Sequence, residues 1–437
     1  MKHVILLFLS TILSATSLYS QSWQAIGSSP ASVTTANFSV VAVDNEIPYI
    51  AYQDGDLGNK VTVKKYINGA WTTVGNAGFT AGGATYIKLA FYNHTPYVAY
   101  TDYSVAQKIS VMKFDGTTWV QVGNVGFSGG LTAYIDLLID NSGTPYVSML
   151  DYYNSSKLSV YYFNGTNWVQ KGGLGFSYGA AQYTSLAKDS NGDLYVACVE
   201  NNFASQIRVF KFNGTGWQEL GAYASEANCW QATLAVDGTT PYLAYCTSGT
   251  SGVARVRKFE NGAWVNIANA STQLSSWTNM KIRNGVIYLA FTETNNYNPV
   301  LKSYAGERWT TVGGSTIASI TANYVNMDLK SDGTPIVVFK NLSNANKIAT
   351  YFYGTSINTA VNDIISEPSG FYPNPASDRV FFKNGDASRK QILNLDGKLL
   401  LSTTENQLNI SNLKAGVYLI RSTNEQGAII TAKLIKN

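Results

Sequence analysis

The stretch Phe114-Asp115-Gly116-Thr117-Thr118-Trp119, continued by Val120-Gln121-Val122-Gly123, is one copy of a pattern that returns along most of the chain. Its tryptophan has counterparts at intervals of 45 to 49 residues: Trp23, Trp71, Trp168, Trp217, Trp264 and Trp309. A turn that ends in glycine, most often Asn-Gly, precedes six of the seven tryptophans. Asn-Gly and Asp-Gly between apolar runs are typical of β-hairpins, because both residues tolerate positive φ. The pattern therefore predicts a repeated β-structure.

Each repeat has room for four short strands. In the second complete repeat they are expected at 86–92, 96–101, 108–114 and 119–122, with Gly, Asn, Asp or Pro between them. A four-stranded antiparallel unit at this period is typical of a β-propeller blade, and seven repeats predict seven blades.

The two ends of the repeat array are complementary. The last repeat ends near residue 354 without a tryptophan strand, whereas the first tryptophan strand, at 23–27, has no partner strands before it. Pairing of these two segments would complete one blade and remove two exposed sheet edges. We therefore predict an all-β fold in which a seven-bladed propeller, residues 21–356, is closed by its N-terminal strand.

The first residues have the features of a secretory signal peptide. Lys2 and His3 precede an apolar run at 4–13, and small residues follow, which predicts a signal peptide over residues 1–20. The apolar run is shorter than the roughly 20 residues that span a bilayer, so we do not expect an integral membrane protein. The net charge is only +4 over 437 residues, which argues against nucleic acid as a partner.

Residues 370–437 break the repeat. They contain Phe371-Tyr372-Pro373-Asn374-Pro375, then Asn394-Leu395-Asp396-Gly397-Lys398, then Lys414-Ala415-Gly416-Val417-Tyr418, and the final Lys433-Leu434-Ile435-Lys436. Short alternating strands with turns at Pro-Asn-Pro and Asp-Gly predict a small Ig-like β-sandwich. Such a sandwich could be a permanent Ig-like binding module of the protein.

The order and spacing of these landmarks resemble the C-terminal sorting domain of the type IX secretion system of Bacteroidota. The resemblance implies contact of residues 370–437 with the secretion machinery and a secreted or outer-surface location in a Gram-negative bacterium. Residues 357–369 would then be the linker. The turns at 114–119 and 163–168 also resemble, in part, the Asp-box turns of sialidase-type propellers and the repeats of propeller lectins.

Two kinds of loop should share one face of the propeller, here called the loop face. They join the second strand of a blade to its third, and the fourth strand to the first strand of the next blade. An aromatic residue is expected at the start of each inner strand, where it would either stack on sugars at the channel mouth or pack between blades. These residues are Phe38, Tyr86, Tyr134, Tyr183, Trp230, Trp277 and Tyr324.

Acidic residues end the second strand in five repeats: Asp54, Asp102, Asp151, Glu200 and Glu293. A lysine follows the first three after six residues, which predicts exposed ion pairs across the next hairpin. Glu200 and Glu293 lack that lysine and are better functional candidates. Because the loops diverge in blades four to six, the predicted ligand-binding set is Glu200, Glu226, Trp230, Trp277, Glu293 and Tyr297.

No catalytic, metal or cofactor site is predicted. His94 is the only histidine after the predicted signal, which leaves no pattern for a histidine-based triad or metal cluster. The acidic segment 54–59 leaves Ca²⁺ as an alternative, although a solvated turn explains it. Cys229 and Cys246 flank the Asp237-Gly238 turn symmetrically, which predicts a disulfide between them and a reduced Cys198.

These features favour a binding protein that recognises a glycan or another protein through the loop face. A glycan-degrading hydrolase or lyase is the first alternative, and hydrolysis would need two carboxyl groups about 5–10 Å apart. A structural surface protein without a ligand is the second.

Overall fold

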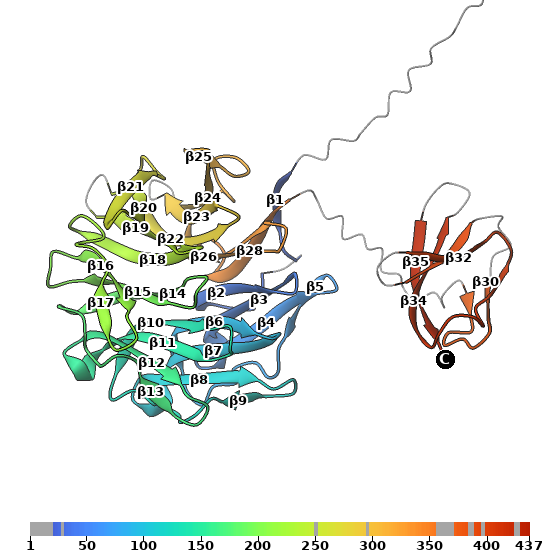
Figure 1. Cartoon of the computed structure of the whole chain (residues 1–437), viewed down its shortest axis with the longest axis horizontal. Helices are drawn as coiled ribbons and strands as arrows, with labels where there is room; N and C mark the ends of the chain where they lie inside the picture. The colour runs from blue at the N-terminus through green and yellow to red at the C-terminus, as the bar shows by residue number, and fades with distance from the viewer. Residues whose placement is uncertain are drawn as a thin grey trace, which may run out of the picture. The chain divides into compact units, whose positions relative to one another are not determined.

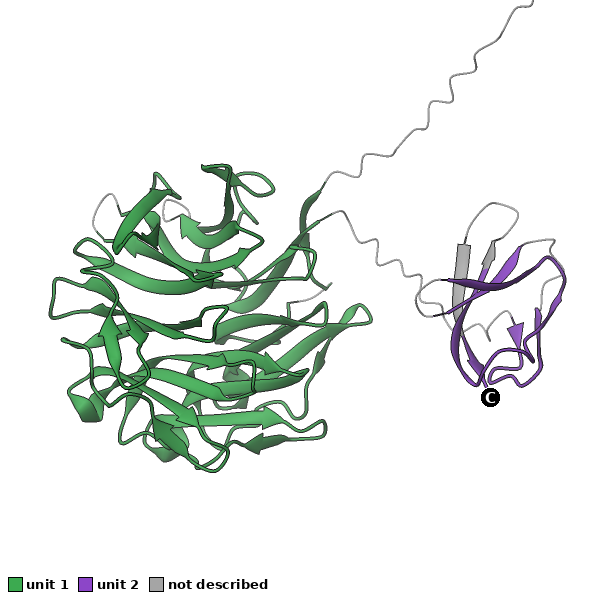
Figure 2. Ribbon diagram, in the orientation of Figure 1, with its two compact units in different colours: residues 1–356 green, residues 357–437 purple. Residues whose placement is uncertain are grey.

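The computed structural model of the chain describes residues 21–27, 30–248, 252–293, 297–354, 371–382, 389–394, 398–423 and 429–437. The chain divides into two compact units, residues 1–356 and 357–437 (Figure 2). The predicted signal peptide and the predicted linker at 357–369 lie outside the described residues. Among the described residues no helix is long and apolar enough to cross a membrane.

The first unit is a ring of seven four-stranded antiparallel sheets (Figure 1). Blade 1 contains β2 (Ala36–Asp44), β3 (Ile47–Asp54), β4 (Lys60–Ile67) and β5 (Ala70–Thr73). Blade 2 contains β6 (Ala84–Tyr92), β7 (Thr95–Asp102), β8 (Lys108–Phe114) and β9 (Trp119–Gln121). Blade 3 contains β10 (Thr132–Ile139), β11 (Pro145–Asp151), β12 (Lys157–Phe163) and β13 (Trp168–Gln170). Blade 4 contains β14 (Ala181–Lys188), β15 (Leu194–Glu200), β16 (Gln206–Phe212) and β17 (Trp217–Glu219).

The remaining blades follow the same plan. Blade 5 contains β18 (Cys229–Asp237), β19 (Thr240–Thr247), β20 (Ala254–Glu260) and β21 (Ala263–Asn269). Blade 6 contains β22 (Ser275–Arg283), β23 (Val286–Glu293), β24 (Asn298–Ala305) and β25 (Arg308–Thr311). Blade 7 contains β26 (Ala322–Leu329), β27 (Pro335–Asn341), β28 (Lys347–Gly354) and β1 (Ser22–Ala25). Short 3₁₀ turns follow the second strand in blades 1 to 3: Gly55–Leu57, Tyr103–Val105 and Tyr152–Asn154.

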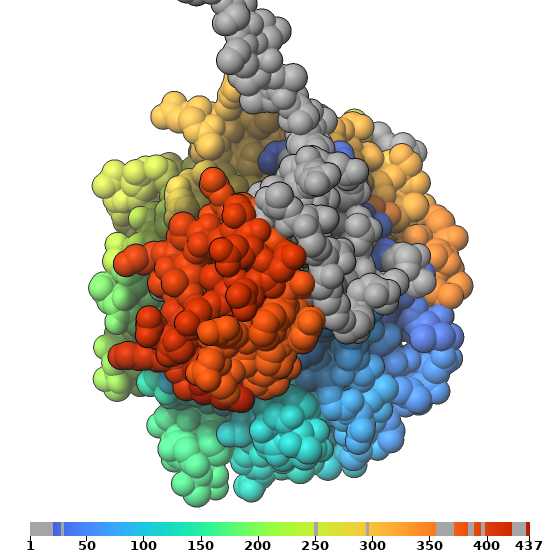
Figure 3. Space-filling model, turned by 90° about the vertical axis from the view of Figure 1, so that its right-hand side faces the viewer, coloured from blue at the N-terminus to red at the C-terminus, as the bar shows by residue number. Residues whose placement is uncertain are grey.

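The ring closes as predicted. Strand β1 pairs antiparallel with β28, and Trp23 lies opposite Tyr353. The inner strands β26 and β2 of the last and first blades also pack together. Figure 3 shows the colours following one another around the ring until the blue and orange ends meet. The prediction of a seven-bladed propeller closed by its N-terminal strand is confirmed.

The repeated tryptophan ties six of the seven blades to the blade before them, whereas the indole N–H of Trp309 in blade 6 has no hydrogen-bond partner among the described residues. The indole N–H of Trp168 donates a hydrogen bond of 2.8 Å to the carbonyl of Val122 in the preceding blade. The same ring lies against Gly123, where φ is +68° and an added Cβ would come within 2.7 Å of Phe163. Only glycine allows this approach, which explains why the tryptophan strand ends in glycine.

The blades pack face to face through apolar side chains. The cluster between blades 3 and 4, for example, includes Tyr146, Leu158, Val196 and Phe210. The inner strands have backbone N–H groups that do not pair with another strand. Several of them donate hydrogen bonds to side chains of the preceding blade. Asp136 accepts from the N–H of Leu186 at 2.8 Å, and Asp328 accepts from the N–H of Val43 at 2.7 Å.

The propeller has two different faces. The loop face, as defined above, carries the second-to-third and fourth-to-first connections. The opposite face carries the tight turns between first and second strands and between third and fourth strands, and is called the turn face here.

The second unit is a small sandwich of two sheets. One sheet has the order β29 (Phe371–Tyr372), β30 (Arg379–Phe382), β33 (Gln407–Asn409). The other has the order β32 (Leu399–Thr403), β31 (Lys390–Leu393), β34 (Gly416–Thr423), β35 (Ile429–Lys436). Side chains from both sheets, including Phe371, Val380, Ile392 and Ile420, share one buried core. The tail therefore forms a β-sandwich.

Candidate functional site

Exposed aromatic side chains gather on the loop face. In the described part of the propeller every large apolar side chain that is exposed lies in a loop of this face, except Val265 on an outer strand. Seven of them are aromatic: Tyr103, Tyr152, Tyr153, Tyr178, Phe203, Tyr223 and Tyr297. Exposed aromatic rings on one face mark an interaction surface, because burial of such rings by a partner is favourable.

The acidic residues that end the second strands are structural in blades 1 to 3. The register places Asp102 opposite Lys108 and Asp151 opposite Lys157, as expected, but these residues are not among the ion pairs of the described chain. Asp102 and Asp151 are instead 1% and 0% exposed. Asp54 lies opposite Lys60 and likewise forms no ion pair with a described residue, so the prediction of ion pairs is wrong in all three blades.

The carboxylates in these blades accept hydrogen bonds from a hydroxyl group eight residues later. The donors are Thr62 to Asp54 at 2.8 Å, Ser110 to Asp102 at 2.8 Å, and Ser159 to Asp151 at 2.9 Å. The same hydroxyl groups accept from the backbone N–H of Gly78, Gly126 and Gly175, respectively. In blades 1 to 3, therefore, an acid, a hydroxyl and a glycine close the space between the loops.

Blade 4 replaces all three members of this set. The acid is Glu200, the position eight residues later is Arg208, and Tyr223 stands in place of the glycine. Tyr223 is assigned to this position from the hydrogen bond of the next residue. The N–H of Ala224 donates to the carbonyl of Ile207, just as the N–H of Phe176, which follows Gly175, donates to the carbonyl of Leu158 in blade 3. We call Glu200, Arg208, Glu219, Tyr178, Phe203 and Tyr223 the Arg208 cluster.

The Arg208 guanidinium organises this cluster. Its Nε donates to Glu200 Oε2 at 2.8 Å, and its Nη1 donates to Glu219. Its Cζ lies 4.6 Å from the ring centroid of Tyr178, 4.2 Å from that of Tyr223 and 5.4 Å from that of Phe203. Cation–π contacts of this kind hold aromatic rings in fixed positions. Arg208 itself is buried, whereas Tyr178 and Tyr223 are 54% and 44% exposed.

Glu226 lies beside this cluster, in the loop from blade 4 to blade 5. It accepts from the Tyr245 hydroxyl at 2.6 Å and forms ion pairs with Arg255 at 2.5 Å and Arg257 at 3.3 Å. Burial, followed by the hydrogen bond to Glu226, raises the pKa of Tyr245. The Nε atoms of both arginines are buried and have no hydrogen-bond partner among the described residues. Two guanidinium groups therefore share one carboxylate.

The aromatic residues at the inner strands form a ring around the central channel, which has a volume of about 370 Å³. Their rings pack against one another with centroid distances between 4.5 and 5.5 Å, from Trp277 through Tyr324, Phe38, Tyr86 and Tyr134 to Tyr183. Each sits at a bulge with φ near +50°. These contacts support the packing alternative for the ring.

Trp230 does not belong to the ring. The channel position of blade 5 is filled by Gln231, which has the same positive φ as the aromatic residues of the other blades. The bulge between Trp230 and Thr233 sets this register, and Trp230 packs instead against the core between blades 5 and 6. The expectation of Trp230 in the ring is wrong by one residue.

Glu293 and Tyr297 flank the second-to-third connection of blade 6. Glu293 ends β23 opposite Asn298, and Tyr297 is 47% exposed with φ of +52°. Within the described chain neither residue forms a side-chain hydrogen bond, ion pair or ring contact with Glu200, Glu226 or Trp277. The structure therefore brings Glu200 and Glu226 to neighbouring loops but leaves Trp277, Glu293 and Tyr297 apart from them.

The predicted disulfide is absent. Cys198, Cys229 and Cys246 are all free and buried. Cys229 lies opposite Thr247, and Cys246 lies opposite Trp230. Cys229 packs into the core between blades 4 and 5, whereas Cys246 packs into the core between blades 5 and 6. The prediction is wrong because the two side chains point to opposite faces of the sheet.

Comparison with known proteins identifies the tail. Residues 370–437 match the family model of the secretion system C-terminal sorting domain. The tail is a type IX secretion sorting domain. The sorting domain indicates export to the cell surface or the medium of a Gram-negative bacterium of the Bacteroidota, as the sequence resemblance implies. It also implies contact with the type IX secretion machinery.

The propeller of this sorting-domain protein is similar to solved structures at low identity. A polysaccharide lyase described as PL25 ulvan lyase is 12% identical with a TM-score of 0.53, over 77% of this chain and 96% of that chain. A fungal alcohol oxidase of the AA5 family is 12% identical with a TM-score of 0.51, over 95% and 98%. The Aleuria aurantia lectin is 15% identical with a TM-score of 0.45, over 65% and 98%. The first two support the fold alone. A search of curated proteins finds no match.

Proposed function

We propose that the exported propeller is a non-catalytic carbohydrate-binding protein and that the Arg208 cluster on the loop face is its main binding surface. The observation that carries the proposal is the group of three exposed aromatic rings around one buried guanidinium. Sugars present apolar C–H faces that stack on such rings, and rings fixed in advance lose little conformational freedom on binding.

The polar neighbourhood supports a carbohydrate more than a large protein partner. The loop beside the cluster offers Glu226 and the two partly exposed guanidinium groups of Arg255 and Arg257. Hydroxyl groups of a sugar can bond to both kinds of group. A few aromatic platforms with a polar rim suit a small ligand, whereas stable protein interfaces need about 800 Å² on each partner.

The enzyme alternative finds less support in the same residues. Glu200 is fully buried, and its two oxygens already accept from the N–H of Tyr178 and from Arg208. Among the described residues of the loop face, Glu226 is paired with two arginines and Glu293 lies in another blade, so neither forms with Glu200 a pair of accessible carboxyl groups for general acid and base roles.

A glycan array probed with the whole protein tests the proposal. We expect binding without release of product, and we expect Tyr178→Ala combined with Tyr223→Ala to weaken it at least about tenfold. Tyr103→Ala is the control, because Tyr103 is similarly exposed on the same face but lies over no guanidinium of the described residues. Unchanged binding by the double variant, or an array without any ligand, would contradict the proposal, and product release would favour the enzyme.

A further inference from the structure

The turn face carries three pockets that repeat from blade to blade. They lie between blades 1 and 2, between blades 2 and 3, and between blades 3 and 4, with volumes of about 510, 530 and 470 Å³. Each is bounded by the two hairpin turns of one blade and the second strand of the blade before it. The tyrosine on that second strand is Tyr49, Tyr97 and Tyr146, respectively.

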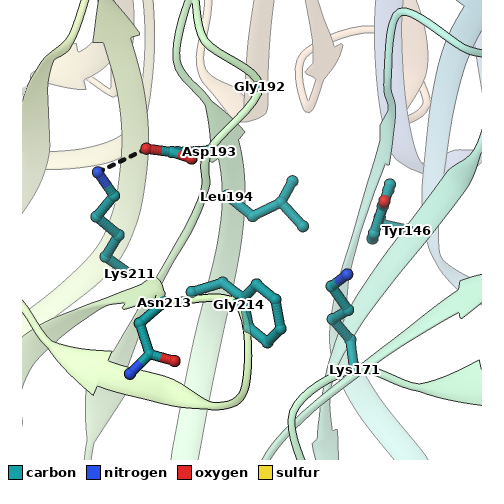
Figure 4. A pocket seen from close by; sticks show the side chains of 9 residues that line it. Tyr146, Lys171, Gly192, Asp193, Leu194, Lys211, Asn213 and Gly214 are labelled. Carbon is teal, nitrogen blue, oxygen red and sulfur yellow. Dashed lines mark ion pairs between the residues drawn. The ribbon is translucent and has the colours of Figure 1, made fainter.

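A lysine that forms no ion pair with a described residue lines each pocket. In the first pocket Lys113 has Asp115 nearby, where, after hydrogen bonds from the backbone, it contributes to lowering the pKa of that carboxyl. Lys65 and Lys113 line the first pocket, Lys113 the second, and Lys171 the third. None of these three lysines forms an ion pair with any described residue. Lys211 also lines the third pocket, but it is paired with Asp193 at 2.8 Å (Figure 4).

The third pocket keeps its lysine by a change of position. Lys65 and Lys113 lie directly opposite Tyr49 and Tyr97 on the third strands, but the same register in blade 3 places Tyr162 opposite Tyr146. Lys171 instead follows the fourth strand, where blades 1 and 2 have Val74 and Val122. Blade 3 therefore has a tyrosine and a lysine at the two positions where blades 1 and 2 have a lysine and a valine, and its lysine still lines the pocket.

The ammonium group of Lys171 lies over aromatic rings. Its Nζ is 4.4 Å from the ring centroid of Phe212, 5.1 Å from that of Tyr162 and 5.9 Å from that of Tyr146. Figure 4 shows the lysine beside Tyr146 at the pocket. The pocket thus combines one positive charge with ring faces and edges, which suits a ligand that has both an anionic group and apolar C–H groups.

Turn-face lysines without an ion pair occur at this position on one side of the ring only, among the described blades. In blade 5 the corresponding Lys258 is paired with Glu260 at 3.0 Å, and blades 6 and 7 have Ser303 and Phe352 at this register position. Unpaired lysines at these pockets therefore follow one another only from blade 1 to blade 3, as a short row along the turn face.

We propose that this row binds a polysaccharide that carries repeated carboxylate or sulfate groups, with one acidic group in each of the three pockets. Three unpaired ammonium groups spread over three neighbouring pockets match a polymer with an occasional charge. It is too sparse for nucleic acid, where a duplex carries a charge every 1.7 Å or so and affinity depends on many phosphate contacts. This site lies on the face opposite the Arg208 cluster and does not depend on it.

Binding of the whole protein to immobilised polygalacturonate and dextran sulfate tests the proposal, with neutral dextran and oligothymidylate as comparison probes. The triple variant Lys65→Gln, Lys113→Gln, Lys171→Gln should bind at least one acidic polymer about tenfold or more weakly than the natural protein, and with a flatter salt dependence. The matched control is Lys258→Gln, Lys330→Gln, Lys347→Gln, which removes the same charge elsewhere and should stay within about twofold.

Three results would overturn the proposal. They are absence of binding to both acidic polymers, equal weakening by the two triple variants, and stronger lysine-dependent binding of oligothymidylate. A thermal melt of each variant shows that the fold is kept. Tyr178→Ala with Tyr223→Ala should leave binding to the acidic polymer unchanged, so that failure of the loop-face proposal and failure of this one give different results.

Discussion

Blades 3 and 4 use the same position of the fold for different purposes. In blade 3 a serine hydroxyl bridges a buried aspartate and the N–H of Gly175, and the loop above it is closed. In blade 4 an arginine fills the position of the serine, a glutamate that of the aspartate and Tyr223 that of the glycine. The buried acid is satisfied in both blades, but only blade 4 presents several exposed rings held by a cation. Replacement of three residues together therefore converts a structural contact into the surface that we propose binds a carbohydrate.

The largest effect is expected when the arginine is removed. Arg208→Ala leaves the fully buried carboxylate of Glu200 without its counter-charge, and we expect the free energy of unfolding to fall by about 3–5 kcal/mol. Denaturant unfolding followed by tryptophan fluorescence measures this. A loss below about 1 kcal/mol would show that Arg208 does not stabilise the blade in the way that its contacts indicate.

A conversion of blade 4 into the blade 3 arrangement separates stability from binding. Glu200→Asp, Arg208→Ser and Tyr223→Gly together should restore most of the stability that Arg208→Ala loses, to within about 2 kcal/mol of the natural protein, because the acid again has a hydroxyl partner. Glycan binding should nevertheless fall at least about tenfold. Retained binding in this folded triple variant would exclude the Arg208 cluster as the binding surface.

The corresponding change in blade 3 should be milder. Ser159→Ala removes a hydrogen bond to Asp151 and one from Gly175, but Asp151 still accepts from the N–H of Tyr153 and from Asn154. We expect a loss of about 1–3 kcal/mol in unfolding free energy and no effect on glycan binding. A change in glycan affinity would show that the closed loops of blades 1 to 3 also contribute to the surface.

The smallest effect concerns alkaline pH in blade 5. Because the pKa of Tyr245 is raised in the folded protein, its stabilising contribution is complete below pH 10, the ordinary value, and is lost as the pH rises toward the folded pKa. Between pH 8 and 10.5 the natural protein should therefore lose about 0.8 kcal/mol more stability than Tyr245→Phe. Equal losses in the two proteins would contradict the assignment.

The fold could be predicted from the sequence because its signals repeat. Seven tryptophans with glycine turns fix the blade count, and the unmatched strands at the two ends of the array fix the closure. The tail was predicted from its own landmarks. In the propeller the same turn and the same inter-blade contact recur at regular spacing, and in the tail several landmarks occur in a characteristic order.

The site could be predicted only in part. The sequence predicts Glu200 and Glu226 as candidates but does not predict Arg208, Arg255 and Arg257, which lie on third strands, β16 and β20, and not in the loops. A signal was available: Arg208 stands eight residues after Glu200, where blades 1 to 3 have Thr62, Ser110 and Ser159.

Single-residue irregularities explain the other errors. All seven blades share the bulge at the ring position, but in blade 5 Gln231 occupies that position and the tryptophan precedes it by one residue. In the same blade Asp237 pairs with Thr240, so the turn lies one residue later than the Asp237-Gly238 turn predicted. Cys229 therefore faces Thr247. The offset in blade 5 has a sequence signal, because Leu234 stands three residues after Gln231, as Leu186 stands three residues after Tyr183. The extra residue at a bulge also changes the pairing partner of Cys229, which the symmetric spacing around the turn does not predict.

The pairing of β1 with β28 sets the order of events in folding. Residues 22–25 are among the first of the described chain to be synthesised, yet their partner strand ends at Gly354. This pairing therefore cannot form until β28 has been synthesised, more than three hundred residues after β1. A chain that ends before residue 347 would keep an open ring with unpaired strand edges, whatever the stability of its single blades. Such a chain should tend to join with other copies of itself rather than remain a monomer.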